Sequence, residues 1–163
     1  RYLGYFRFEF FGEGLSTLMQ DRKSTKSVEQ AVKEAEQIVM QSATLEDLED
    51  CLAKAAEGMQ FYKAKISFYD SDQGLGSPLE NEQHTICKAI HWRDSEQTGY
   101  FPRDKEFSVE FSISGRNFAY GKVEYTFKDG RSSLSVQDEV LLERIHDAFS
   151  SFAARLRKNE YSI

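Results

Sequence analysis

Residues 107–158 constrain the fold of this chain most, because two arms of strict apolar–polar alternation lead into one long amphipathic pattern. The first arm places four apolar side chains on one face: Phe107, Val109, Phe111 and Ile113. The second arm alternates in the same way from Ala119 to Phe127, after the turn sequence at 115–117. Alternation with period two indicates an antiparallel strand pair with one buried face. These residues therefore predict a scaffold and supply no reacting group.

A helix is predicted after this hairpin. It opens at Ser135, with Asp138 three residues later as in a capping box, and one stripe carries most of its apolar residues. That stripe consists of Leu141, Ile145, Ala148, Phe149, Phe152 and Leu156. Such spacing by three and four residues is typical of a helix that packs one face on a core.

Five further elements are predicted upstream of the hairpin. The aromatic segment Tyr2–Phe11 favours a strand, helices are expected to start at Val28 and at Thr44, and strands at Phe61–Asp70 and His84–Arg93. We expect residues 20–27 to form a polar linker, and residues 71–83 and 94–106 to form loops. Because strands and helices do not alternate, we predict an α+β domain in which helices pack on one face of an antiparallel sheet.

The composition fits one globular domain rather than a disordered chain. The sequence has 163 residues, of which 40% are hydrophobic and 29% charged. A net charge of −6 argues against nucleic acid as the main partner. No apolar run approaches the roughly 18 residues that a membrane span requires. Cys51 and Cys87 lie far apart in the sequence, so we expect free thiols in a reducing compartment.

No candidate for catalysis or metal binding survives inspection of the sequence. His84, Cys87 and His91 resemble zinc ligands, but His84 has the opposite parity on a strand and no fourth ligand is evident. Cys51 falls on the apolar side of its helix, where a buried thiol is expected. His146 is expected to be partly exposed. We therefore predict no catalytic residue, no metal site and no cofactor.

The layout resembles a GAF domain over residues 28–158. The matching pieces are the helix at 44–59, the strand at 64–70, the hairpin at 107–127, which contains Phe118-Ala-Tyr-Gly-Lys-Val123, and the helix that begins with Ser135-Val-Gln-Asp138. This resemblance implies a central antiparallel sheet with helices behind it. The cysteine that anchors a bilin in photoreceptor GAF domains has no convincing counterpart, so no chromophore is expected.

The order of the segments along the whole chain resembles a more specific group of proteins. An aromatic and basic start, paired helices and a GAF-like unit are similar to the cytosolic C-terminal extension of some bacterial family-4 sugar-phosphate transferases. These enzymes join a nucleotide-activated amino sugar phosphate to undecaprenyl phosphate. The chain begins at Arg1 with six aromatic residues among its first eleven, which we interpret as a domain cut from a longer polypeptide. The resemblance implies an aromatic strand and linker at 1–27 after a membrane region, a GAF-like domain at 28–163, and a location at the cytoplasmic face of a membrane, with the isolated fragment soluble.

Three functional hypotheses follow. The first is a non-catalytic regulatory domain that senses a small molecule at four lining residues: His91, Trp92, Tyr100 and Phe101. The second is a ligand-free homodimerisation module that uses the last helix and the segment Tyr2–Phe11. The third is a small-molecule enzyme on a GAF-like scaffold, which would need a set of reactive cysteines. The sequence gives neither the ligand, nor the oligomeric state, nor the direction of regulation.

Overall fold

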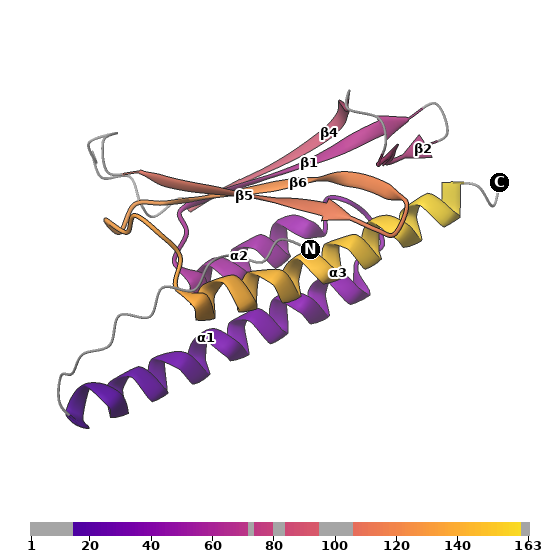
Figure 1. Ribbon diagram of the computed structural model, residues 1–163. Coiled ribbons are helices and arrows are strands. Elements are labelled where there is room, and N and C mark those ends of the chain that lie inside the picture. The colour runs from indigo at the N-terminus through magenta and orange to yellow at the C-terminus, as the bar shows by residue number, and fades with distance from the viewer. Residues whose placement is uncertain (1–14, 72–73, 80–83, 95–105, 161–163) are drawn as a thin grey trace.

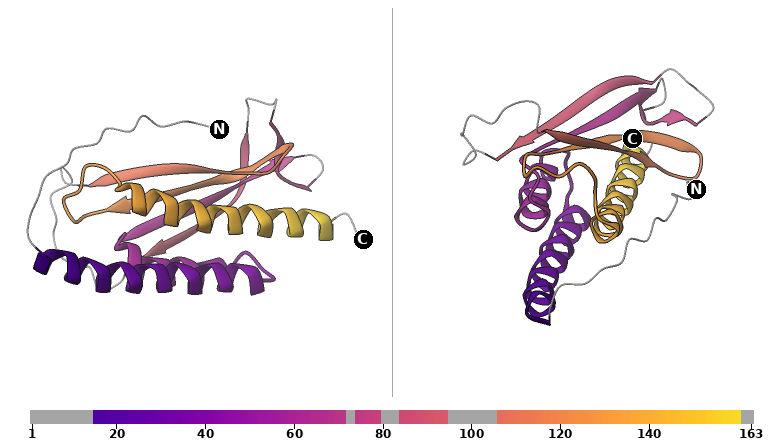
Figure 2. Two further views of the ribbon diagram at one scale, coloured as in Figure 1. Left: turned by 60° about the horizontal axis from the view of Figure 1, so that its bottom comes forward. Right: turned by 60° about the vertical axis from the view of Figure 1, so that its left-hand side comes forward.

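The described part of the chain folds into two layers, a six-stranded antiparallel sheet and three helices that all lie on one of its faces (Figure 1). The computed structural model describes residues 15–71, 74–79, 84–94 and 106–160. The helices are α1 (Leu15–Gln41), α2 (Leu48–Met59) and α3 (Val136–Glu160). Two further views show the three helices together beneath the sheet and its other face without a helix (Figure 2). The predicted α+β architecture is confirmed.

Four long strands form the body of the sheet. They are β1 (Lys63–Ser71), β4 (Thr85–Arg93), β5 (Phe107–Ser114) and β6 (Phe118–Phe127). Strand β1 pairs with β4 on one side and with β6 on the other, and β5 pairs with β6, so the order across the sheet is β4-β1-β6-β5. Two short strands, β2 (Gly74–Leu75) and β3 (Ser77–Pro78), pair with the ends of β1 and β6. They lie within a segment that the sequence predicted to be a loop.

The predicted hairpin is β5 and β6, and its alternation sets which face is buried. Val123, Tyr125 and Phe127 are fully buried on the helix side, and Ile113 is buried opposite Gly121. The register shifts between Ile113 and Ser114, so that Tyr120 is an extra residue on β6. Such a bulge bends a strand locally. The buried Tyr120 is therefore an exception to the strict alternation expected for this arm.

Helix α1 begins at Leu15, so the helix predicted from Val28 is thirteen residues longer at its start. Residues 20–27 are helical and do not form the predicted linker. The reason is local: the segment from 15 to 41 contains neither Gly nor Pro, and Gln, Arg and Lys are good helix formers. The polar composition of this segment did not argue against a helix.

The helix ends test the predicted caps. At α3, the Ser135 hydroxyl accepts a hydrogen bond from the Asp138 N–H at 3.1 Å, and the Asp138 carboxylate accepts one from the Ser135 N–H at 3.4 Å. This capping box was predicted. The second helix begins at Leu48 and not at Thr44, since residues 45–47 form a turn. The Asp47 carboxylate holds that turn by accepting the N–H groups of Ala43 and Thr44, each at 2.9 Å.

A single core lies between the two layers. Its largest fully buried side chains come from both layers and from the residues just before β1: Tyr125, Phe61, Phe68, Phe127, Phe149 and Phe152. Helices α1 and α3 are joined at their surface by Arg144, which donates to both carboxylate oxygens of Glu36 at 3.0 and 2.6 Å. Arg155 donates to the carbonyls of Val39 and Met40 at the end of α1. Two arginine side chains of α3 therefore connect it to α1.

Candidate functional site

The candidate site is the face of the sheet that no described helix covers (Figure 1). Because Ala64, Ile66 and Phe68 of β1 point into the core, the residues between them point to this face. The pairing register then assigns the neighbours on β4, β6 and β5. This uncovered face carries Lys63, Lys65, Ser67, Tyr69, Ala89, His91, Arg93, Lys122, Glu124, Thr126, Ser108, Glu110 and Ser112. Apart from Ala89 and from Ile86, which lies opposite Tyr69 and is 46% exposed, this face is polar and charged, whereas the helix face is apolar.

Acidic and basic side chains are not evenly spread over this face. Strands β1 and β4 bring the cations Lys63, Lys65 and Arg93 together with His91. Strands β5 and β6 bring Glu110 opposite Glu124, and Lys122 donates a hydrogen bond to Glu110 at 2.7 Å. The uncovered face therefore has a basic half on β4 and β1 and a mixed half on β6 and β5.

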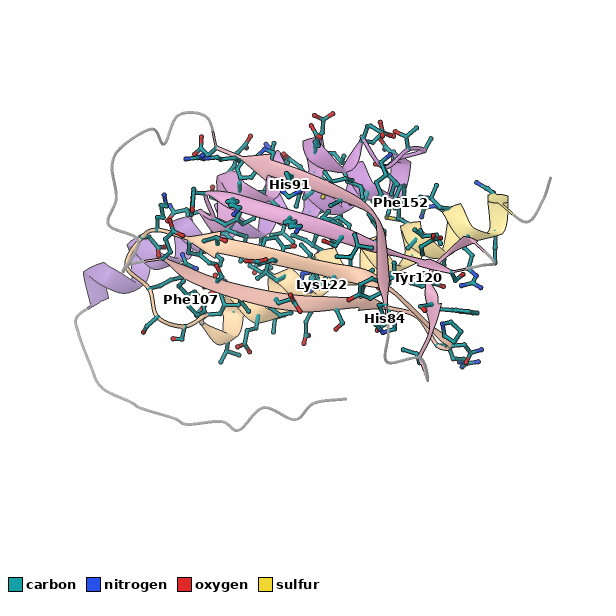
Figure 3. The ribbon with its side chains drawn as sticks, turned by 90° about the horizontal axis from the view of Figure 1, so that it is seen from above. His84, His91, Phe107, Tyr120, Lys122 and Phe152 are labelled. Carbon is teal, nitrogen blue, oxygen red and sulfur yellow. The ribbon has the colours of Figure 1, made fainter. Side chains whose placement is uncertain are left out.

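An imidazole lies at one end of the uncovered face. The ring of His84 stacks on the ring of Tyr69, with centroids 4.5 Å apart and planes within 9° of parallel. Its Nδ1 atom is buried and has no hydrogen-bond partner among the residues that the structure describes. A buried polar atom without a partner costs free energy, roughly 1–3 kcal/mol in proteins. Figure 3 shows the sheet from this side, with His84, His91 and Lys122 labelled.

The four predicted lining residues do not all come together. His91 is exposed on the uncovered face, and its register partner is Lys65. Trp92, as the next residue of β4, points to the other face and packs edge-to-face on Phe61 at 5.4 Å between centroids. Trp92 therefore contributes to the core. It cannot share a site with His91, because neighbouring residues on a strand point to opposite faces of the sheet. Tyr100 and Phe101 lie outside the described residues, so their part in a site stays a prediction.

Two buried ionisable groups face the core and not the candidate site. Cys51 is fully buried, as the sequence predicted, and burial raises the pKa of its thiol to about 12. It is protonated at neutral pH and supplies no thiolate for nucleophilic chemistry. His146 was expected at the surface, but it is only 7% exposed. It lies between Phe111 and Tyr125, with its Nε2 atom 3.2 Å from the Tyr125 hydroxyl oxygen.

The environment of His146 explains its protonation state. Burial without a facing carboxylate lowers its pKa from 6.5 to about 3, so the ring is neutral at pH 7. The pKa of Tyr125 is raised well above its usual value by burial. Both groups are neutral members of the core. Among the described residues there is no group of three or more His, Cys, Asp or Glu side chains that could hold a metal ion.

Solved structures establish the fold class. The GAF domain of a phosphoenolpyruvate-protein phosphotransferase from Acinetobacter aligns over 77% of this chain and 92% of its own length, with 14% identity and a TM-score of 0.51. The chromophore-binding domain of the Stigmatella aurantiaca bacteriophytochrome in the Pr state aligns over 80% of this chain and 60% of its own, with 11% identity and a TM-score of 0.50. The chain therefore has a GAF-like fold, as its sequence predicted.

The sequence itself does not match known proteins. No model of a protein family matches it, and no curated protein matches it significantly. At 11–14% identity, the two structures establish the fold and no more. Over the described residues, no helix has the length and the apolar character that crossing a membrane would require.

Sequence reasoning found His91 but missed the other members of the uncovered face. The alternation within β1 could have placed Lys63, Lys65, Ser67 and Tyr69 on one face. The partners across the sheet could not be found, because a strand pairing needs the register, and two bulges interrupt it. The contact between His84 and Tyr69 depends on the bulge in β4, where the register shifts between Phe68 and Tyr69.

Proposed function

We propose that this chain is a non-catalytic sensory or regulatory domain that binds a small molecule on the uncovered face of its sheet. One observation carries the proposal: in the described part of the chain, three helices pack on one face, while the other collects charged and ring side chains together with the Nδ1 atom of His84, for which no described residue is a hydrogen-bond partner. A donor or acceptor from a ligand would satisfy that nitrogen. The GAF-like fold supports this reading, since the chromophore-binding domain of a bacteriophytochrome has the same fold.

The contacts of α3 give a physical route from this face to the helix layer. Arg157 donates hydrogen bonds to the carbonyls of Leu75 and Gly76, at 3.2 and 3.3 Å, and its guanidinium lies 3.4 Å from the centre of the Phe118 ring. The same helix contacts α1 through Arg144 and Arg155. A ligand that binds one arrangement of the sheet end more tightly would shift the positions of α3 and α1.

We extend the proposal to the protein from which the domain comes. The arrangement of paired helices and a GAF-like unit supports a role as the cytosolic regulatory part of a membrane sugar-phosphate transferase. In that role the domain would sense a metabolite, and the membrane part of the parent protein would be its partner and carry out catalysis at the cytoplasmic face.

A screen of small metabolites by thermal shift tests the function. We expect at least one compound to raise the melting temperature of the chain. Ala89→Trp places a bulky ring in the middle of the uncovered face, and Gln37→Trp places the same ring on the exposed side of α1 as a matched control. The stabilisation should disappear in Ala89→Trp and persist in Gln37→Trp. Equal effects in both variants, or no stabilising compound at all, would contradict ligand sensing at this face.

A second function, ligand-free dimerisation, is favoured by a separate observation. Val136 and Val140 lie one turn apart at the start of α3 and are 60% and 52% exposed. Exposed apolar side chains of this kind gain free energy by burial in an interface. Sedimentation of the chain at increasing concentration tests this function: self-association that Val136→Ser with Val140→Ser abolishes would support it, and a monomer at all concentrations would exclude it.

A further inference from the structure

A cluster of basic side chains on the uncovered face includes one cross-strand pair of like charges. In the register of β1 and β4, Lys63 lies directly opposite Arg93, and Lys65 lies directly opposite His91. Directly opposed like charges on one face of an antiparallel pair are destabilising. This cluster, which we call the basic rectangle, occurs in a chain whose net charge is −6. Fold stability does not explain it.

Nearby carboxylates do not neutralise the basic rectangle. Glu124 lies opposite Lys65 on the β6 side, and Glu106 interacts electrostatically with Lys63. However, within the described part of the chain neither Lys65 nor Arg93 forms an ion pair. The carboxylates of Glu110 and Glu106 instead hold Lys122 and Lys128, at 2.7 and 3.3 Å. Counted over the described residues, the rectangle therefore keeps an excess of positive charge.

The spacing of the rectangle limits what it can bind. Opposed residues on paired strands are about 5 Å apart, and alternate residues on one strand about 7 Å apart. Four side chains with N–H donors thus extend from a patch of this size, which suits a compact group with several negative oxygens. An extended polyanion or an anionic membrane would also cover the neighbouring pair Glu110 and Glu124, which would repel it.

We propose that the basic rectangle of Lys63, Lys65, His91 and Arg93 binds the phosphates of a small soluble diphosphate ester. Lysine and arginine side chains bind phosphate oxygens through charge-assisted hydrogen bonds, and arginine can donate two in parallel. This inference rests on the proposed function, since it names the chemical class of the ligand that the uncovered face senses. The positive charge is offset by the ligand, which relieves the repulsion between strands β1 and β4.

Calorimetric titration with inorganic pyrophosphate tests the inference, using Lys65→Gln with Arg93→Gln. The matched control is Lys33→Gln with Arg116→Gln, which removes the same two charges from exposed positions on α1 and on the hairpin turn. We expect pyrophosphate affinity to fall at least tenfold in the first variant and to stay within twofold in the control. Added salt should weaken binding to the unmodified chain, because the contacts are ionic.

Three results would overturn the inference. In the first, the chain does not bind pyrophosphate. In the second, both double variants lose the same amount of affinity. In the third, the chain binds vesicles that contain phosphatidylglycerol more tightly than it binds pyrophosphate. The metabolite screen separates this failure from that of the proposed function. One outcome is a phosphate-free compound that no longer stabilises Ala89→Trp but still stabilises Lys65→Gln with Arg93→Gln. This outcome would support ligand sensing at the uncovered face and reject a diphosphate as the ligand. The absence of any binding compound would reject both.

Discussion

At the scale of single residues, His146 shows how burial changes the chemistry of a side chain. Its ring packs against Phe111 and Phe149, and its Nε2 atom contacts the Tyr125 hydroxyl. The sequence placed it next to the buried Ile145 and offered no sign that both would be buried. In a helix that packs under a wide sheet, two adjacent positions can both face the core. Hydrophobic periodicity alone could not reveal this, because histidine is counted as polar.

The neutral His146 should make folding sensitive to acid. Its pKa is 6.5 when unfolded and about 3 when folded, so the unfolded chain takes up a proton first as the pH falls. The resulting contribution to stability is present above about pH 6.5 and is lost as the pH falls towards 3. The loss amounts to about 1.4 kcal/mol per pH unit within that window.

Urea unfolding between pH 7 and pH 4 measures this effect in the unmodified chain and in His146→Gln. Glutamine keeps a polar group near Tyr125 and does not titrate, so carboxylate contributions cancel in the comparison. We expect the free energy of unfolding to fall less steeply with acid in the variant, by up to about 1.4 kcal/mol per pH unit. Parallel pH profiles would show that His146 is not held neutral in the folded state.

Gly121 is a second residue whose role follows from its surroundings. A Cβ atom added there would lie 2.1 Å from the Ser67 carbonyl oxygen on the neighbouring strand. Backbone cannot yield as a side chain can, so Gly121→Ala should cost about 3 kcal/mol in unfolding free energy, the upper end of the usual range for overpacking. Gly130→Ala is the control, because its φ of +84° is strained but nothing lies within 4 Å. It should cost only about 1 kcal/mol, and a larger loss there than at Gly121 would refute the packing argument.

At the scale of elements, periodicity predicted the long strands and the apolar stripe of α3 because these elements each bury one face. The start of α1 was missed, since polar residues without Gly or Pro are compatible with both a linker and an exposed helix. Strands β2 and β3 were missed because two residues are too few to show alternation. The uncovered face could be predicted for one strand at a time, whereas the basic rectangle required the register between β1 and β4.

The opposed pair Lys63 and Arg93 should lower the stability of the sheet. Arg93→Gln removes the repulsion and should raise the free energy of unfolding by about 0.2–1 kcal/mol at low ionic strength. The gain should shrink in 0.5 M salt, where the Debye length is about 4 Å. Arg116→Gln, in the exposed turn, serves as the control and should change stability little. A destabilised Arg93→Gln variant would mean that the guanidinium makes favourable contacts.

At the scale of the whole molecule, the two faces of the sheet have different roles. The helices and one sheet face form the core, and the other sheet face exposes basic side chains of β1 and β4, among them Lys63, His91 and Arg93, that can meet a ligand. Arginine contacts from α3 reach both α1 and the end of the sheet, so a change on the uncovered face has a path to the helix layer. The sequence predicted this architecture but could not identify the complete set of residues on the uncovered face.

The most direct test of this account is an amide NMR titration of the isotopically labelled chain with inorganic pyrophosphate. We predict shift changes centred on β1 and β4, around Lys63, Lys65, His91 and Arg93, with smaller changes reaching α3. Shift changes confined to the helix layer, or spread over lysines of the whole surface, would contradict the claim that the uncovered sheet face is the ligand site.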